Sequence, residues 1–252
     1  MTDASSSLSS LIWADWPAPD HVKACVSTRI GGFSPAPYDS FNMGDHVGDS
    51  PANVVKNRAR FLHLCRLKRV GQWLTQVHGT QVVEAKDDGK VREGDAVYSH
   101  EANLPCVVMT ADCLPVLFTD EQGSVVAAAH AGWRGLASGV LEKTVATMGV
   151  APSSVLAWMG PAIGRHQFEV GGEVRREFVE HHPATDQAFQ PDYQSRGKYY
   201  ADLYELARIR LGLIGVHQVF GGGFCTWKDE RFYSFRREGT TGRMASMIWI
   251  KK

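Results

Sequence analysis

The chain has no excess of charge of either sign: 27 Lys and Arg balance 27 Asp and Glu, so the formal net charge is zero. A dedicated nucleic-acid binder, or a protein held on anionic lipid, depends on a surplus of positive charge. The sequence also has no uninterrupted apolar stretch near the roughly 18 residues that a membrane-spanning helix needs. We therefore expect no nucleic-acid partner and no membrane partner, and a small molecule as substrate.

Cysteine is scarce, and an export signal is missing. The segment 1–16 has neither the basic region nor the long apolar region of a secretory signal peptide. The cysteines are odd in number and scattered, mostly beside apolar residues: Cys25, Cys65, Cys106, Cys113 and Cys225. In a chain without an export signal such cysteines are expected to stay reduced, which predicts a cytoplasmic location.

The composition is that of an ordinary globular protein, with 44% hydrophobic and 21% charged residues among 252. No internal repeat or low-complexity linker divides the chain, and the predicted strands and helices alternate without a strict βαβ repeat. We predict a single α/β (α+β) domain over residues 11–252, with mixed β-sheets flanked by helices, as a monomer or a homodimer. The Ser-rich segment 1–10 is predicted to be disordered.

Apolar periodicity predicts the elements of this domain. One helix is expected to begin at Pro51, after Asp49 or Ser50 as its cap. Further helices are expected over 135–148, 172–182 and 201–214. Strands are expected near 22–28, 71–77, 80–85, 95–98, 104–110, 114–119, 124–130, 154–160, 216–220, 231–236 and 245–250.

Three candidate metal ligands lie where apolar runs end: His78 in TQVHGT, Cys113 in TADCLP and His130 in AAHAGWRG. Two imidazoles and one thiolate fill three corners of a zinc tetrahedron and leave the fourth open, as a catalytic zinc site requires. Each is predicted to project from a strand end, where neighbouring strands can bring them together. Their separations match no compact zinc-finger pattern, so three unrelated core residues are the alternative.

Charged residues near these ligands each have two interpretations. Asp112 is a candidate to orient a ligand imidazole or to carry a proton, or it is a solvated carboxylate. Arg134 lies at a predicted helix N-terminus, where backbone amides favour anions, or it lies in solvent. Arg236, Arg237 and Arg243 in FYSFRREGTTGR could clamp an anion, although arginine-rich surface strands often have no chemical role.

Motifs along nearly the whole chain resemble those of the laccase-domain family, the YfiH-like proteins also grouped as multicopper polyphenol oxidoreductases. In order, they are STRIGGFS (27–34), SFNMGDHVGD (40–49), NRARF (57–61), TQVHGT (75–80), GDAVYS (94–99), TADCLPVLF (110–118), AAHAGWRG (128–135), GPAIG (160–164), FEVG (168–171) and SFRREGTTGR (234–243). Many motifs in one order are more specific than any single motif. The resemblance implies a single α/β domain similar to the fold of cytotoxic-necrotizing-factor-type cysteine hydrolases.

The resemblance also implies a zinc site at His78, Cys113 and His130. The activity that it implies is phosphorolysis of adenosine, inosine and methylthioadenosine to a base and a sugar 1-phosphate, with adenosine deamination as a side reaction. Some members are linked instead to peptidoglycan editing, in which serine is removed from a nucleotide-linked muramic acid precursor, and older descriptions name a polyphenol oxidase. We predict Cys113, His130 and Asp112 as catalytic residues.

Two of these chemistries lack their usual residues. A multicopper oxidase needs His-X-His pairs and a His-Cys-His bridge, and neither pattern occurs in this chain. Copper could still bind adventitiously, because it outcompetes zinc at most nitrogen and sulfur sites. The pattern of nucleobase deaminases is missing too, since Gly and Thr follow His78 and the next cysteine after Cys106 lies seven positions on.

The substrate contacts are predicted from the same motifs. Arg29 or Arg134 is expected to hold phosphate beneath the sugar, while Asn42 and Gln76 contact the base or ribose. A zinc-bound water would serve deamination or hydrolysis. Two alternatives stay open: a metal-free cysteine hydrolase, with Cys113 as nucleophile and an imidazole as base, and a non-enzymatic metabolite-binding module.

Overall fold

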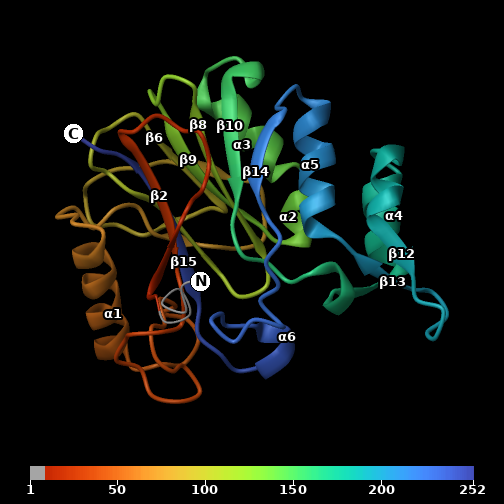
Figure 1. Cartoon of the computed structure of the whole chain (residues 1–252), viewed down its shortest axis with the longest axis horizontal. Helices are drawn as coiled ribbons and strands as arrows, with labels where there is room; N and C mark the ends of the chain where they lie inside the picture. The colour runs from red at the N-terminus through yellow and green to blue at the C-terminus, as the bar shows by residue number, and fades with distance from the viewer. Residues whose placement is uncertain (1–8) are drawn as a thin grey trace, which may run out of the picture.

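Two sheets packed face to face form the centre of the computed structural model, which describes residues 9–252 (Figure 1). The larger sheet has six strands in the order β14 (Gln218–Gly221), β10 (Val155–Met159), β8 (Leu114–Asp120), β9 (Val126–Ala131), β6 (Ala96–Ser99) and β4 (Val82–Glu84). Its inner strands pair antiparallel, whereas β14 and β4 at the edges pair in parallel. The sheet is therefore mixed, as predicted.

The second sheet has four antiparallel strands in the order β1 (Leu11–Trp13), β2 (Val22–Ser27), β15 (Met244–Ile250) and β7 (Cys106–Thr110). Its inner face packs on the larger sheet through a shared hydrophobic cluster that includes Val108 and Ile248. On its outer face lies helix α1 (Pro51–Leu64), whose Phe61 is fully buried. Burial on both faces explains why β7 and β15 are nearly continuous apolar runs.

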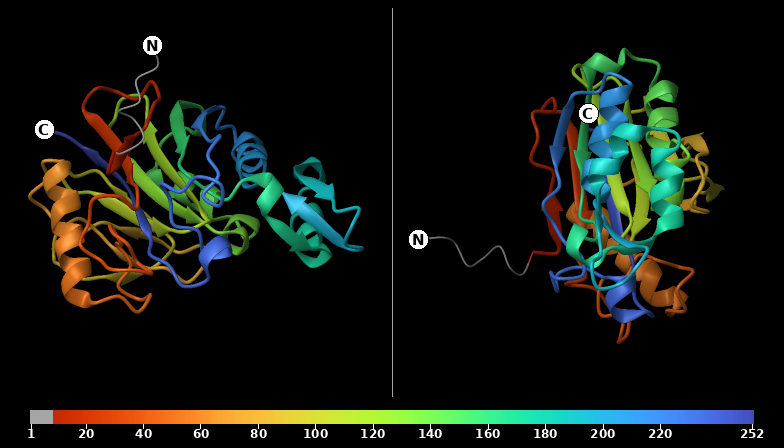
Figure 2. Two further views of the ribbon diagram at one scale, coloured as in Figure 1. Left: turned by 60° about the horizontal axis from the view of Figure 1, so that its bottom comes forward. Right: turned by 90° about the vertical axis from the view of Figure 1, so that its right-hand side faces the viewer.

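Helices cover the far face of the six-stranded sheet and complete an α/β/β/α stack (Figure 2). They are α2 (Trp133–Ala137), α3 (Val140–Met148) and α5 (Leu203–Leu213). Alternate residues of β8 point to opposite faces of the sheet: Phe118 packs under these helices, and Leu117 packs against the four-stranded sheet. Because the strand period is two, β8 is buried on both sides.

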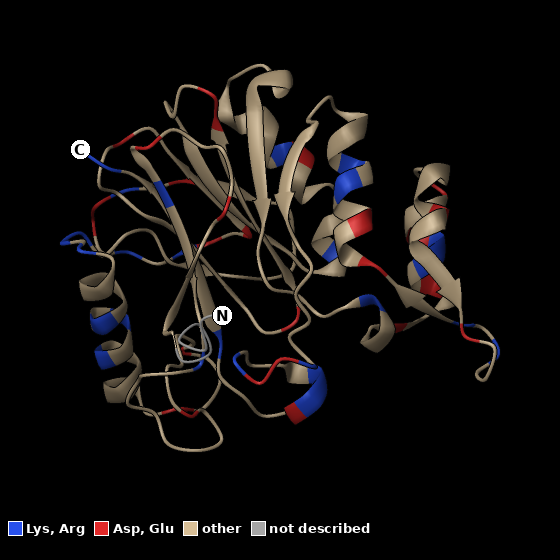
Figure 3. Ribbon diagram, in the orientation of Figure 1, with Lys and Arg blue, Asp and Glu red and all other residues tan. Residues whose placement is uncertain are grey.

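A small unit projects beside this stack, drawn in teal in Figures 1 and 2. It consists of β11 (Glu169–Gly171), β13 (Lys198–Ala201), β12 (Phe189–Pro191) and helix α4 (Gly172–Val179). The remaining elements are the strand pair β3 (Leu74–Thr75) and β5 (Arg92–Glu93), helix α6 (Phe235–Glu238), and 3-10 turns at Pro152–Ser154, Arg165–Gln167 and Pro183–Ala188. Acidic and basic residues are mixed over the helices and loops, in line with the balanced charge (Figure 3). Over residues 9–252, no helix combines the length and the apolar character needed to cross a membrane.

Three predicted elements were wrong in part. The helix expected over 135–148 is two helices, because Gly139 adopts a left-handed conformation with φ of 95°. The strand expected near 231–236 is a turn followed by α6, whose first turn is capped by the Ser234 side chain. The strand expected near 71–77 is only Leu74–Thr75, so His78 lies in a turn.

The predicted disordered segment 1–10 falls mostly outside the described residues, which begin at Ser9. Ser9 and Ser10 are held by Thr28. The Thr28 hydroxyl donates to the Ser9 carbonyl at 2.9 Å, and its backbone N–H donates to the Ser10 carbonyl at 2.9 Å.

Candidate metal centre

The three predicted ligands converge in the structure. The ligand atoms of His78, Cys113 and His130 all lie within 4.8 Å of one another, and Cys113 Sγ is 3.9 Å from His78 Nε2. Cys113 occupies the turn between β7 and β8, and His130 is the penultimate residue of β9. Antiparallel pairing places Pro115 opposite His130, which brings Cys113 beside that imidazole.

The turn that carries His78 is held by a buried carboxylate. His78 has φ of 61°, a left-handed conformation that is uncommon for a residue with a side chain. Asp95 accepts hydrogen bonds from the backbone N–H groups of Val77, His78 and Gly79 at 3.3, 2.9 and 2.6 Å. These bonds stabilise the turn and fix the direction of the His78 side chain.

The same carboxylate orients the second imidazole. His130 Nδ1 lies 2.9 Å from Asp95 Oδ1, and the Asp95 side chain has no solvent exposure. A carboxylate on one ring nitrogen fixes the tautomer and leaves the other nitrogen free for a metal. Our sequence prediction missed Asp95, although it lies in the GDAVYS motif; an acidic residue directly before a buried strand was the available signal.

The thiol and the imidazole at the centre shift each other's ionisation. Burial opposes the thiolate of Cys113, but the positive charge of His130 and hydrogen bonds from both imidazoles outweigh it and lower the pKa to about 6. Burial likewise opposes the charged form of His130, but the Cys113 charge and the Asp95 hydrogen bond raise its pKa to about 9. A metal-ligating cysteine must be a thiolate, so this pairing favours the required form of the sulfur. A metal-ligating imidazole must be neutral, so metal binding would displace the proton that the thiolate stabilises on His130.

The donor set and the space between the donors fit a zinc ion. Zinc bonds of ~2.0–2.3 Å place tetrahedral ligand atoms about 3.3–3.6 Å apart, so small side-chain rotations would close the observed spacing. Gly132 leaves the necessary room: a Cβ there would lie 2.8 Å from His78 Cδ2 and 3.1 Å from Cys113 Sγ. His130 is buried, Cys113 is half-buried and His78 is exposed, so the cluster is open on one side.

That open side faces a pocket of about 500 Å³. Its lining combines aromatic side chains with guanidinium groups: Trp133, Phe168, Phe235, Arg134, Arg236 and Arg243. Aromatic faces suit a planar base, and guanidinium groups suit an oxyanion. The pocket is therefore complementary to a small ligand that contains a planar base and an oxyanion.

Of the predicted substrate contacts, some line this pocket and others do not. Gln76 and Arg134 line the pocket, with the Gln76 amide bonded to the Met109 backbone and the Arg134 guanidinium 4.3 Å from the Trp133 ring. Asn42 is fully buried and does not line it. Its side-chain oxygen accepts the N–H of Arg243 at 2.9 Å, so Asn42 supports a pocket residue.

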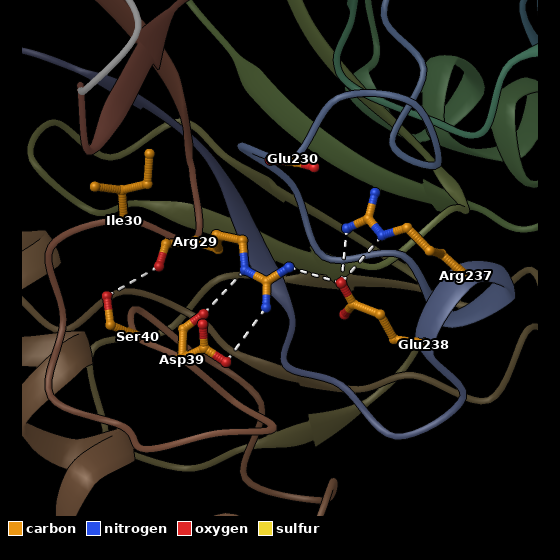
Figure 4. Close-up of a pocket in the computed structure, with 7 residues that line it drawn as sticks. All are labelled: Arg29, Ile30, Asp39, Ser40, Glu230, Arg237 and Glu238. Carbon is orange, nitrogen blue, oxygen red and sulfur yellow. Dashed lines mark hydrogen bonds and ion pairs between the residues drawn. The ribbon is translucent and has the colours of Figure 1, made fainter.

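Arg29 lies in a separate polar pocket of about 460 Å³ (Figure 4). Its guanidinium forms ion pairs with Asp39 at 3.4 Å and Glu238 at 2.6 Å, and Arg237 binds the same Glu238 oxygen at 2.8 Å. All three nitrogens of Arg29 have protein acceptors. This network connects Arg29 and Asp39 to α6, and Arg29 is not among the described residues that line the pocket at the metal cluster.

Asp112 lines the pocket, but its carboxylate is hydrogen-bonded to groups other than the two imidazoles. One carboxylate oxygen accepts from the Thr226 hydroxyl at 2.6 Å and the other from the backbone N–H of Arg236 at 2.7 Å. Asp112 thus anchors the segment that carries α6, and the imidazole-orienting role predicted for it belongs to Asp95.

The fold and the cluster together define a class: a mixed α/β protein with a two-histidine, one-cysteine candidate metal centre open to a pocket. A family model described as multi-copper polyphenol oxidoreductase laccase matches residues 23–251. The chain belongs to this family, as the motifs predicted.

Relatives and solved structures agree with this assignment. A purine nucleoside phosphorylase of Pseudomonas aeruginosa is 55% identical over 94% of this chain and 97% of its own length. The purine nucleoside phosphorylase YfiH of Escherichia coli is 51% identical over 96% of this chain and 100% of its own. A Neisseria meningitidis crystal structure, 46% identical, superposes with a TM-score of 0.93 over 97% of this chain and 100% of that one.

Proposed function

We propose that this chain is a zinc-dependent purine nucleoside phosphorylase that acts on adenosine, inosine and methylthioadenosine, with adenosine deamination as a side activity. The observation that carries the proposal is the open His78, Cys113 and His130 cluster beside a pocket with aromatic and basic walls. The names of the two bacterial relatives, which match over nearly their whole lengths, support the same activity. The cytoplasmic location and the monomeric or homodimeric state stay predictions.

In phosphorolysis a phosphate oxygen bonds to C1′ of the ribose as the C1′–N9 bond breaks, and the electron pair leaves with the purine. The aromatic side chains Trp133, Phe168 and Phe235 are positioned to hold the base. Asp95 holds His130 and the His78 turn in place, so the cluster does not have to reorganise when substrate binds. A bound zinc ion would supply Lewis-acid polarisation and a water of lowered pKa.

Replacement of Cys113 by Ala tests the proposal. We expect zinc content and inosine phosphorolysis to fall together to background, because only two ligands remain. Cys65→Ala is the matched control, since Cys65 caps the C-terminus of α1 in the hydrophobic cluster on the outer face of the four-stranded sheet and should leave both quantities unchanged. Full phosphorolysis by a zinc-free Cys113→Ala protein would disprove the scheme.

A metal-free cysteine hydrolase is the second candidate. It is favoured by the lowered pKa of Cys113 and by its 3.9 Å separation from the His78 imidazole, which are properties of an activated nucleophile. Amide hydrolysis or deamidation would be its reaction. Inactivation by iodoacetamide, with activity unchanged after chelation, would support this candidate against the zinc enzyme.

A further inference from the structure

Arg243 directly precedes β15, and the surrounding backbone holds its guanidinium in place. Nη1 donates to the carbonyls of Thr241 and Gly242, each at 3.0 Å. Gly44 leaves space for the side chain, since a Cβ at that glycine would lie 2.8 Å from Arg243 Cγ. The backbone N–H is bound by Asn42, so the residue is fixed at both ends.

The other edge of this guanidinium is free. Among residues 9–252, no hydrogen bond joins Arg243 Nε or Nη2 to a protein acceptor, and the side chain forms no ion pair. Nε and Nη2 are two parallel donors, the arrangement that binds two oxygens of a phosphate or carboxylate at once. The guanidinium of Arg29, in contrast, already forms ion pairs with two carboxylates, those of Asp39 and Glu238.

The electrostatic surroundings also leave a place for an anion. The negative groups within range of Arg243 are Cys113 and Asp112, and both are committed elsewhere. Cys113 belongs to the metal cluster, and Asp112 accepts hydrogen bonds from Thr226 and the backbone of Arg236. Arg243 therefore brings a positive charge that forms no ion pair among residues 9–252 into the pocket that contains the candidate metal ligands.

We propose that Arg243 is the phosphate-recognition residue of this site, with its Nε–Nη2 edge binding two oxygens of inorganic phosphate beside the metal cluster. The inference rests on the proposed phosphorylase function for its biological meaning, but the binding it describes can be measured alone. Arg134 and Arg236, which are exposed on the same pocket, add positive potential along the approach. A phosphate held here would be positioned against the sugar in place of water.

Direct binding of inorganic phosphate provides the first test, by titration calorimetry on the metal-loaded wild-type protein and on variants. Arg243→Gln is expected to weaken phosphate binding roughly ten- to a hundredfold, because it removes a charge-assisted pair of hydrogen bonds. Arg243→Lys, which keeps the charge but loses the planar fork, is expected to lose a large part of that affinity. Arg175→Gln on α4 is the matched control, because Arg175 does not line the pocket and pairs with Asp186, and this variant should bind like wild type.

Steady-state kinetics with inosine provides the second test. The KM for phosphate should rise by a similar factor in Arg243→Gln, while the KM for inosine and the zinc content change little. Arg29→Gln is included as the rival phosphate residue. A wild-type KM for phosphate in Arg243→Gln, or a raised one only in Arg29→Gln, would overturn the inference, as would a wild-type protein that binds no phosphate.

The two proposals fail in distinguishable ways. If wild type binds phosphate through Arg243 yet yields no sugar 1-phosphate from inosine, the proposed function falls and the anion site stands. If phosphorolysis proceeds and Arg243→Gln leaves phosphate binding intact, the function stands and the inference falls. Thermal midpoints of all variants separate either result from simple unfolding, and Arg243→Lys retains the side-chain bulk if the Gln variant does not fold.

Discussion

The candidate metal centre contains three residues that would bind the ion and one residue that holds two of these three in position. Asp95 is the positioning residue, because its one carboxylate holds both the His78 turn and the His130 ring. Residue identity was enough to select the three side chains that converge in the structure, since His and Cys are the usual ligands of zinc. It was not enough to predict Asp95, because aspartates at strand ends are common and only the fold shows what this one contacts.

Replacement of Asp95 by Asn should lower zinc affinity about ten- to a hundredfold, the usual range for a group that orients a metal ligand. The amide keeps the size but cannot accept all of the backbone N–H bonds or hold the imidazole as strongly. The measurement is a competition titration with a chelator. Asp120→Asn is the control, since Asp120 is a buried carboxylate at the other end of β8 and should affect stability only. Unchanged zinc affinity in Asp95→Asn would refute the positioning role.

The pKa of Cys113 predicts a pH profile for the metal-free protein. A thiol reacts as its thiolate, and an ordinary cysteine reaches half ionisation only near pH 8.5. With the pKa lowered to about 6, the rate of Cys113 alkylation by iodoacetamide should rise as the pH increases through about 6 and level off above it. His130→Asn removes the stabilising charge, so its midpoint should move to higher pH. Peptide mass spectrometry gives the rates, and a wild-type midpoint near 8.5 would contradict the assigned pKa.

At the scale of elements, the link between β9 and α2 makes the cluster possible. His130 is the penultimate residue of the strand, Gly132 caps the helix with an ordinary extended conformation, and the helix starts at the next residue. Gly132 is therefore required for space rather than for a left-handed backbone. Long apolar strands such as β8 were predicted to within a few residues, whereas β11–β13 were missed because strands of three or four residues show no reliable period.

Replacement of Gly132 by Ala should lower zinc affinity, by tenfold or more as an order-of-magnitude expectation for a displaced ligand set. The new methyl group would overlap the space of His78 Cδ2 and Cys113 Sγ. The control is Gly212→Ala in α5, where a Cβ meets nothing within 4 Å and the helix gains a better helix former. The measurement is the zinc content by elemental analysis. A wild-type zinc content in Gly132→Ala would show that the side chains of His78 and Cys113 can move more than the structure indicates.

At the scale of the whole molecule, the two sheets act as one rigid support for the cluster. The strands next to Cys113 and His130 are buried on both faces, between the helices on one side and the second sheet on the other. Sites held by such elements keep their geometry better than sites on long loops. Stability of the core and occupancy of the metal site should therefore be separable.

Replacement of Phe118 by Ala tests this separation. Phe118 is fully buried under the helices, so its loss should decrease the free energy of unfolding by about 3–5 kcal/mol. Urea denaturation gives the value, and zinc content at low temperature should stay at the wild-type level. Leu213→Ala, at a side chain that is 55% exposed, should change stability by less than about 0.5 kcal/mol. A large loss of zinc in folded Phe118→Ala would show that the core and the site are coupled.

The sequence by itself determined the mixed α/β class, the family, the main strands and helices, and the three candidate ligands, because each of these depends on residue type, periodicity or local order. Only the tertiary structure decided which charged groups meet those ligands. It placed Asp95 on His130, Arg243 in the pocket and Arg29 in another pocket, where Glu238 neutralises it. The physical reason is that strand pairing and sheet packing bring together positions tens of residues apart, and local sequence patterns do not show which of these positions become neighbours.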